Sequence, residues 1–365
     1  MMINLTGVAV AGALSVDICP QIKSDSPEGF GDLIHPGRIT QITSSKIDLG
    51  GPVANTGRAL KKFGLRPHLV AKIGRDDLGR ILYDMLNRQM GAMAADSIAI
   101  QEDGDTAYSV ILAPDGLDRA ILQNPGANDT FAPEDIDWQP IKRCKWFHFG
   151  HPSTMKKMYE KNDDGYGEGL LEVMKKAKEH KMITSLDLCA IDPDSGAGSC
   201  DWEEIMTKVL PYVDFFLPSI GDLDGVFFPQ GTTQDPSADL IGLAEQAAEK
   251  SRDLGAGCVL IKLGEQGAYY SNSRGDFFRG IEKIMRLLPG SLSDWEKRKG
   301  HAPAVPAETI VSGLGAGDVT IAAYIACLTH TYDFKTTLRL AMTEGALSLS
   351  TATSTDGLVP LDELL

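Results

Sequence analysis

A glycine-rich turn near the carboxyl end of the chain is the segment best suited to chemistry. Gly313, Gly315 and Gly317 follow a short apolar run, and a helix-like stretch over residues 319–329 begins directly after Asp318. Glycines let backbone N–H groups approach an anion, and the first turn of a helix adds unpaired N–H groups and the positive end of its dipole. The pattern therefore indicates a phosphate-binding turn. Asp318 either caps the helix or accepts a proton from an attacking hydroxyl group.

Two better-known phosphate-binding patterns do not fit this turn. The Lys-Ser/Thr pair that ends a Walker loop is missing, and Asp318 stands where a dinucleotide fingerprint has its third glycine. That fingerprint also follows the first strand of its fold, and Gly7 and Gly12 do not supply it there. An NAD-dependent oxidoreductase is therefore disfavoured.

The four residues Gly315-Ala316-Gly317-Asp318 resemble the carboxyl-terminal signature of the ribokinase-like (PfkB) family of sugar kinases. The usual form of that signature is Asp-Thr-x-Gly-Ala-Gly-Asp. The resemblance implies that Gly315, Ala316 and Gly317 form an anion hole for the transferred phosphoryl group, and that Asp318 is the catalytic base. It also implies that ATP is the phosphoryl donor and that Mg²⁺ accompanies it.

Other segments resemble motifs of the same family and occur in the family's order, from about residue 7 to residue 360. Residues 50–55 are similar to its Gly-Gly-x-x-x-Asn substrate motif, and residues 262–267 match its Lys-x-Gly-x-x-Gly turn on the nucleotide side. The substrate-binding residues implied in this way are Asp17, Gly50, Gly51, Asn55 and Arg119. The cofactor-binding residues implied are Lys262, Gly264, Gly267 and Asp187. Arg119 also fits a simple exposed charge.

Two motifs depart from the family pattern. Ser312-Gly313 stands in place of Asp-Thr, which removes a carboxylate near the phosphates. The metal-organising Asn-x-x-Glu motif falls at residues 219–222, where Ser219 replaces Asn and Asp222 replaces Glu. Asp222 is the expected metal residue, because Mg²⁺ keeps much of its hydration shell and tolerates a shorter carboxylate. The departures leave open a non-catalytic, sugar-binding relative, and activation by a monovalent cation is also left open.

Two histidines, His148 and His151, flank Gly150 at a predicted strand end. Such residues either face a ligand at the edge of the sheet or have their ring nitrogens satisfied inside the structure. Both interpretations remain open from the sequence.

Apolar strand-like runs alternate with amphipathic, helix-length stretches along most of the chain. We expect strands at residues 7–13, 68–73, 146–150, 182–188, 213–217 and 258–263, and helices at 76–90, 168–181, 201–210 and 238–254. This β-α-β alternation predicts a mostly parallel sheet with helices on both faces and ligands beyond the carboxyl ends of its strands. Together with the resemblance, the expected fold class is a ribokinase-like three-layer α/β/α sandwich with a mostly parallel central sheet and a small β-sheet lid. Residues 1–365 are expected to form a single kinase domain.

Two regions interrupt the alternation. Segments 38–49 and 106–124 lack helical periodicity and are interpreted as an antiparallel lid, with Asp115-Gly116 as a hairpin turn. Segment 281–300, which carries Trp295 and three consecutive basic residues, is interpreted as a surface insertion. The resemblance further implies a homodimer formed through the lid.

The composition disfavours some classes of binding partner and cellular location. The 50 acidic and 35 basic residues give a formal net charge of −15, which disfavours nucleic-acid binding. No apolar run approaches the roughly 20 residues of a membrane span. The six scattered cysteines contain no C-x-x-C pair and indicate free thiols in a reducing compartment, so a cytoplasmic location is expected.

The combined prediction is ATP-dependent phosphorylation of a hydroxyl group on a sugar or sugar-like small molecule. A nucleoside or vitamin-alcohol kinase of the same fold is the main alternative. The residues do not identify the acceptor. A phosphorylated acceptor would need basic residues near Asn55, and Arg58 alone is not sufficient to predict one.

Overall fold

The computed structural model describes residues 7–22, 29–91, 95–114, 120–351 and 353–365, and its largest feature is a nine-stranded sheet in the order β15-β14-β13-β12-β11-β8-β1-β4-β5. The strands from β5 to β13 run parallel, and β14 and β15 are antiparallel additions at one edge. The prediction of a mostly parallel sheet is confirmed. The strands are β1 Gly7–Gly12, β4 Arg66–Gly74, β5 Ser97–Gln101, β8 Trp146–Gly150, β11 Ile183–Asp187, β12 Phe215–Phe216, β13 Cys258–Lys262, β14 Ala268–Ser271 and β15 Lys299–Ala302.

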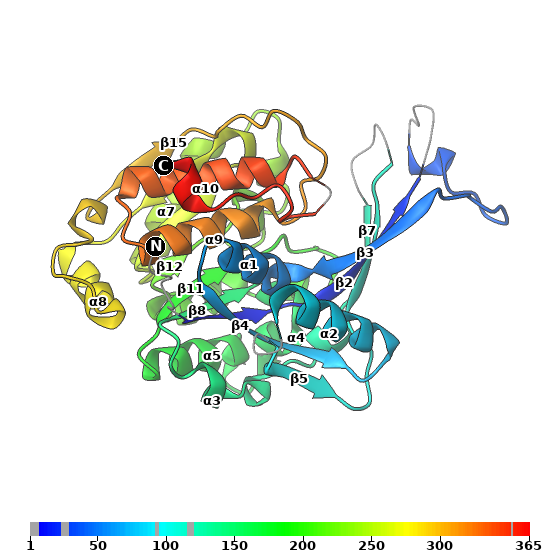
Figure 1. Ribbon diagram of the computed structural model, residues 1–365, viewed down its shortest axis with the longest axis horizontal. Coiled ribbons are helices and arrows are strands. Elements are labelled where there is room, and N and C mark those ends of the chain that lie inside the picture. The colour runs from blue at the N-terminus through cyan, green and yellow to red at the C-terminus, as the bar shows by residue number, and fades with distance from the viewer. Residues whose placement is uncertain (1–6, 23–28, 92–94, 115–119, 352) are drawn as a thin grey trace.

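Helices cover both faces of this sheet, which gives the three layers seen in Figure 1. One buried cluster joins the sheet to α1, α2, α8, α9 and α10, and a second joins the other face to α3, α4, α5, α6 and α7. The helices are α1 Gly51–Lys62, α2 Asp77–Met90, α3 Trp138–Ile141, α4 Lys156–Tyr159, α5 Glu168–Glu179, α6 Trp202–Val209, α7 Leu240–Asp253, α8 Gly275–Met285, α9 Ala316–Thr329 and α10 Phe334–Ser348. None of the described helices is long and apolar enough to cross a membrane.

Local sequence signals explain where several of these helices begin. Four helices begin with an aspartate cap, whose side chain accepts a hydrogen bond from a backbone N–H in the first turn. These caps are Asp76 for α2, Asp201 for α6, Asp239 for α7 and Asp333 for α10. Such caps satisfy backbone N–H groups that have no partner within the helix. The central strands are mostly apolar and almost fully buried because both of their faces are covered.

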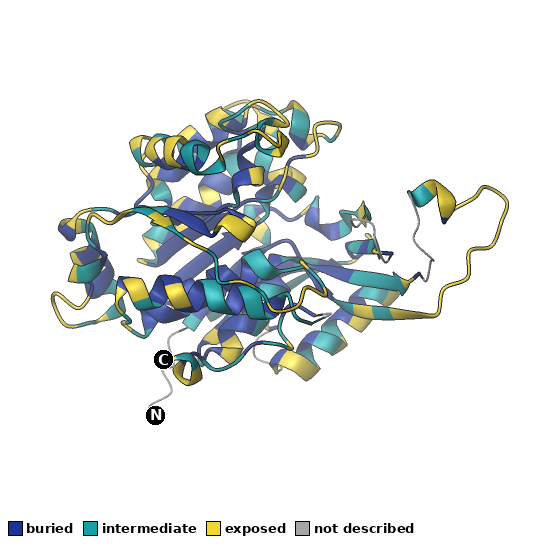
Figure 2. Ribbon diagram, turned by 90° about the horizontal axis from the view of Figure 1, so that it is seen from above, coloured by how far each residue is buried: buried dark blue, intermediate teal, exposed yellow. Residues whose placement is uncertain are grey.

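A separate four-stranded sheet in the order β3-β2-β6-β7 projects from the main body, as Figures 1 and 2 show. Its strands are β2 Ser15–Gln21, β3 Ser44–Gly50, β6 Tyr108–Leu112 and β7 Ala120–Asn124. The predicted lid segments supply β3, β6 and β7, but β2 was not predicted, and strand β3 begins only at Ser44. The predicted turn at Asp115-Gly116 lies outside the described residues.

The interpretation of segment 281–300 as a surface insertion is wrong for Ile281, Leu292 and Trp295, whereas Leu288 is 79% exposed. Trp295 is fully buried, and Ile281 and Leu292 pack into the same core cluster. The carboxylate of Glu282 accepts hydrogen bonds from the backbone N–H groups of Gly290 and Leu292, which fixes the loop after α8. The segment therefore closes the core beside α9, while its basic residues lie outward, where Lys299 pairs with glutamates of α7.

Candidate active site

The glycine turn forms the start of α9 and has backbone geometry that favours glycine. Gly315 is the N-cap residue with φ of 74°, and a Cβ atom there would lie 2.6 Å from Cβ of Ser354 and 3.0 Å from Nδ2 of Asn55. No larger residue fits this close approach without displacement. Asp318 lies in the first turn of the helix and not at its cap, so the capping alternative for Asp318 is wrong.

The carboxyl group of Asp318 is buried, with 6% of the residue exposed. Its Oδ2 accepts a hydrogen bond of 3.0 Å from Nδ2 of Asn55. Among the described residues none donates a hydrogen bond to Oδ1, which is also buried. A buried carboxylate oxygen without a partner is costly, and such groups are common where a ligand supplies the missing contact. Asp318 thus keeps one oxygen free at the positive end of a helix dipole.

Lys262 and Asp187 form a buried ion pair next to this turn. The Lys262 Nζ atom lies 2.9 Å from Oδ1 of Asp187. A Cβ atom added to Gly317 would lie 3.4 Å from the same Nζ, so the ammonium group borders the glycine turn. Burial raises the pKa of the Asp187 carboxyl, and the positive charge of Lys262 opposes that rise.

A cavity of about 600 Å³ opens beside the turn. Its lining includes the predicted nucleotide-side residues Lys262, Gly264 and Gly267 together with Ala316 and Gly317 of the predicted anion hole. Residues that are about 50 positions apart in the sequence therefore border one space. Its size suits a small-molecule ligand.

Asp222 lies at the same end of the sheet, in the short 3-10 helix Ile220–Leu223. Its Oδ2 accepts a hydrogen bond of 2.7 Å from the backbone N–H of Ser219, and Ser219 lines the cavity. Burial, and then the negative charge of Asp187, raise the pKa of Asp222 to about 7. A cation would relieve this concentration of negative charge.

The predicted acceptor residues meet where the lid sheet joins the main body. Asp17 of β2 lies opposite Asp48 of β3, and its Oδ1 accepts a hydrogen bond of 3.1 Å from Ser15. A Cβ atom on Gly50 would lie 2.1 Å from that Oδ1, so only glycine leaves room for the carboxylate. Burial raises the pKa of Asp17 to about 6.

Two further predicted acceptor residues have different outcomes. Gly51, the first residue of α1, has a φ of 83°, and a Cβ there would lie 2.5 Å from the carbonyl oxygen of Ala13. The start of α1 therefore requires a glycine at this position. Arg119 lies outside the described residues, so its predicted contact with substrate stays a prediction.

Arg58 is a site residue whose position the sequence analysis did not predict. Its guanidinium bonds Asp48 at 2.9 Å, the side-chain oxygen of Asn55 at 3.0 Å and Ser354 at 3.2 Å. The contact with the Asn55 oxygen directs the amide nitrogen of Asn55 toward Asp318. The i to i+3 spacing of Asn55 and Arg58 on one helix was the available signal.

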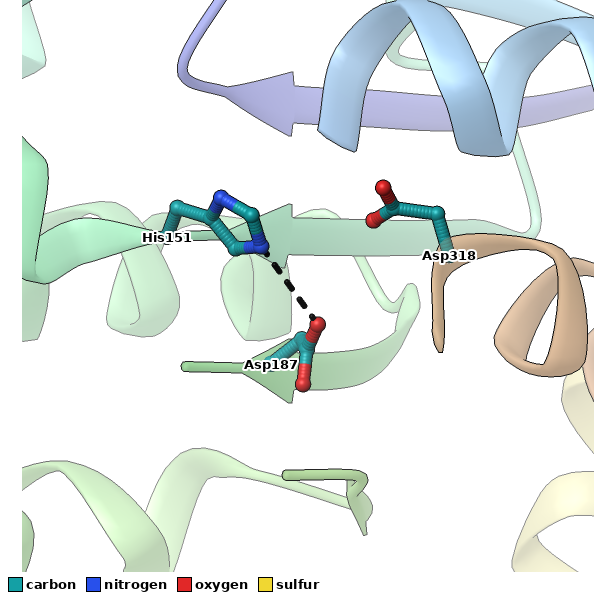
Figure 3. A group of neighbouring side chains, drawn as sticks. All are labelled: His151, Asp187 and Asp318. Atoms are coloured by element: carbon teal, nitrogen blue, oxygen red, sulfur yellow. Dashed lines mark ion pairs between the residues drawn. The ribbon is translucent and has the colours of Figure 1, made fainter. Parts of the chain in front are cut away.

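The two histidines have different environments. His148 is fully buried, and burial lowers its pKa to about 3. Its Nδ1 lies 2.9 Å from Oγ of Ser185, but its Nε2 has no partner among the described residues, so the structural interpretation holds for one ring nitrogen only. His151 is partly exposed, and its Nε2 lies 3.8 Å from Oδ2 of Asp187. Figure 3 shows that His151, Asp187 and Asp318 converge at the ends of β8 and β11 and the start of α9.

Comparison with known proteins identifies the family. The model of the pfkB family of carbohydrate kinases matches residues 28–360. The chain belongs to this family. Carbohydrate kinase is therefore its enzyme class, and the similar proteins carry sugar-kinase names.

An uncharacterized sugar kinase from Archaeoglobus fulgidus is 25% identical over 58% of this chain and 71% of its own length. A 5-dehydro-2-deoxygluconokinase from Bacillus licheniformis is 22% identical over 88% of this chain and 87% of its own length. A shorter match is an ATP-dependent ribose-1-phosphate kinase from Halopiger xanaduensis, which is 30% identical over 39% of this chain and 44% of its own length.

Solved structures confirm the ribokinase-like fold. Arabidopsis thaliana ribokinase, complexed with ribose and ATP, has a TM-score of 0.67 at 17% identity, covering 99% of this chain and 97% of its own. Thermotoga maritima ribokinase has a TM-score of 0.67 at 20% identity, covering 99% of this chain and 98% of its own. At this identity the likeness concerns the fold alone.

Proposed function

We propose that this protein transfers the γ-phosphoryl group of ATP to a hydroxyl group of a sugar or sugar-like alcohol, with Asp318 as the general base. The observation that carries the proposal is the buried, unpartnered Oδ1 of Asp318 at the start of α9. That oxygen takes the proton of the attacking hydroxyl. The backbone N–H groups of the glycine turn stabilise the charge on the transferred group in a site that excludes much of the water.

The nucleotide phosphates are proposed to approach this turn through the cavity bordered by Gly264, Gly267 and Gly317. Lys262 adds a positive charge beside the turn, and its pairing with Asp187 holds the ammonium group in place. The structure of Arabidopsis thaliana ribokinase with ATP supports the choice of nucleotide.

The carboxylates at this end of the sheet are hard oxygen donors and fit Mg²⁺. Asp222 would hold the ion, with Asp187 nearby, and ordered waters would complete the ligand set, as Mg²⁺ usually requires. When bound, Mg²⁺ neutralises negative charge on the phosphates. Activation by a monovalent cation stays a prediction.

The acceptor hydroxyls are proposed to bind Asp17 and Asn55 beneath the lid sheet. A carboxylate and an amide can hold neighbouring hydroxyl groups and would be left unpaired with an analogue that lacks them. The guanidinium of Arg58 is already engaged by Asp48, Asn55 and Ser354, so it is not free to bind a phosphate group. This favours an acceptor that is not already phosphorylated.

The proposal is tested by measuring ADP release with a panel of pentoses, hexoses, keto-deoxy acids and nucleosides. Asp318→Asn should lower kcat with the best acceptor by about 100- to 10,000-fold, the usual contribution of a general base. Nucleotide affinity should stay within a few-fold. Asp84→Asn, an exposed change on α2, is the matched control. Near-normal turnover by the Asp318 variant would refute the base assignment.

Two outcomes of the panel would lead to other functions. A preference for nucleosides would indicate a nucleoside kinase of the same fold. Sugar binding without ATP turnover for every acceptor would indicate a non-catalytic relative, which the departures at Ser312, Gly313 and Ser219 would explain.

Homodimerisation through the lid and a cytoplasmic location are further proposals. The lid strands expose Ile47, Ile121 and Leu122, at 45%, 48% and 60%, and a second copy could cover these apolar side chains. The six cysteines are free, which suits a reducing compartment.

A further inference from the structure

We propose that His151, Asp187 and Asp318 form a binding site for a transition-metal dication such as Zn²⁺ or Co²⁺, and that an ion bound there blocks the catalytic base. Each residue offers one possible ligand atom, and these atoms lie within 4.8 Å of one another. The metal site itself stands on geometry alone, whereas its inhibitory effect rests on the proposed function of Asp318.

The fold brings the three residues together from separate elements. His151 directly follows β8, and its backbone N–H donates to the carbonyl oxygen of Asp187 at the end of β11. Asp318 approaches from the first turn of α9, so its carboxylate and the imidazole of His151 face each other in Figure 3. Two of the three positions are thus fixed by adjacent strands of the rigid central sheet.

Each carboxylate retains one oxygen for a metal. Lys262 occupies Oδ1 of Asp187, which leaves Oδ2, the oxygen nearest to His151. Asn55 occupies Oδ2 of Asp318, which leaves the buried Oδ1 without a partner among the described residues. The existing hydrogen bonds thus leave one oxygen of each carboxylate for the metal. They also orient the two carboxylates, as contacts to the ligands do in many metal sites.

The distances require only a small adjustment. Ligands about 2.1 Å from a tetrahedral ion lie roughly 3.4 Å apart, so a pair at the 4.8 Å limit must close by about 1.4 Å. The side chain of His151 is 26% exposed and can make this movement. Its backbone has φ of 58°, an uncommon conformation outside glycine, which sets the imidazole over the site.

The ligand set distinguishes this ion from the Mg²⁺ that accompanies ATP. Mg²⁺ prefers oxygen ligands and retains water, whereas an imidazole with carboxylates is typical of Zn²⁺ and other first-row transition metals. The carboxylates of Asp187 and Asp318 outnumber the single nearby ammonium of Lys262, so the site attracts a dication. Once bound, the ion occupies the Asp318 lone pair that the acceptor proton needs.

The test is to titrate the nucleotide-free protein with Co²⁺ and follow its visible d–d absorption, then to displace Co²⁺ with Zn²⁺. We expect one bound equivalent, with affinity lowered at least tenfold in His151→Asn and in Asp187→Asn. His35→Asn, at an exposed position, should bind like the wild type and controls for surface histidines. Equal affinity of the wild type and His151→Asn, or an intense near-UV thiolate band from nearby Cys189, would overturn the site.

A second measurement tests the consequence. With Mg²⁺-ATP and a chelator selective for transition metals, the metal-free rates of wild type and His151→Asn are measured first, and Zn²⁺ inhibition of each protein is expressed relative to its own metal-free rate. The Zn²⁺ concentration that halves the activity should rise by the same factor as the binding constant. Unchanged Zn²⁺ inhibition in this variant would overturn the inhibitory role. Because the Co²⁺ titration needs no turnover, failure of the metal site can be told apart from failure of the kinase proposal.

Discussion

Replacing Asp17 by asparagine should make the protein more stable and less able to bind its acceptor. Asp17 lies in β2 opposite Asp48 of β3, and Gly50 leaves room for its carboxylate. Asparagine has nearly the same shape, and its side-chain oxygen can still accept the hydrogen bond from Ser15. The substitution therefore removes a buried charge with little change in packing.

The size of the gain follows from the pKa of this carboxyl, which burial raises from 3.8 to about 6. Each pKa unit corresponds to about 1.4 kcal/mol, so the ionised group destabilises the native state by about 3 kcal/mol at pH 8. Below about pH 4 the carboxyl is protonated in both the folded and the unfolded chain, and the cost disappears. This destabilisation grows as the pH rises and reaches its full size above the pKa that Asp17 has in the folded protein. At pH 5 about half of it should be present.

The assay is chemical denaturation of wild type and Asp17→Asn from pH 5 to pH 8, with acceptor KM measured at pH 8. The variant should gain about 3 kcal/mol in unfolding free energy at pH 8 and about half of that at pH 5. Its KM for the acceptor should rise while KM for ATP changes little. Asp84→Asn is the control for a generic loss of negative charge. A stability difference that does not vary with pH, or an unchanged acceptor KM, would refute the reasoning.

Two further predictions concern the core. Trp295→Ala should lower the unfolding free energy by about 3–5 kcal/mol in denaturation experiments, because it empties a fully buried site. Lys297→Ala, at an exposed neighbour, is the control and should have little effect. A loss of stability in Trp295→Ala no larger than in this control would restore the surface-insertion interpretation. Burial raises the pKa of Glu344 in α10 to about 7 from 4.5. Glu344→Gln should therefore stabilise the protein by about 3 kcal/mol at pH 9 and hardly at all at pH 4 in denaturation experiments, and equal gains at both pH values would contradict this explanation.

The sequence predicted the central fold well because its strands and helices carry strong, regular patterns. Strand β8 has the predicted bounds, and α2 begins one residue after the predicted start because Asp76 is its cap. The glycine turns were also found, since backbone approach and positive φ leave few alternatives to glycine. The sequence therefore sufficed for features that the backbone conformation or the cap of a single helix determines.

Other features depend on contacts that local patterns do not encode. Strand β2 was missed because Asp17 and Pro20 interrupt its apolar pattern; Pro20 is tolerated because β6 pairs only with residues 16–18. Trp295 was placed on the surface because its neighbours in sequence are charged, whereas its ring packs against Tyr324 and Phe334 from later helices. Arg58 looked like an isolated charge because its partner Ser354 is almost 300 positions away.

The contacts of Arg58 connect the lid to the proposed catalytic base. Strand β3 of the lid ends at Gly50, and α1 begins at the next residue, so no loop separates the lid from the helix that carries Asn55. Arg58 bonds both Asp48 in β3 and the side-chain oxygen of Asn55, and the other end of that amide donates to Asp318. A displacement of β3 must therefore change the hydrogen bond that orients the carboxylate. The proposed acceptor residues beneath the lid and the proposed base are thus joined by one chain of hydrogen bonds. Under the proposed function, this chain would couple the position of the lid to the orientation of the base and so limit phosphoryl transfer to water.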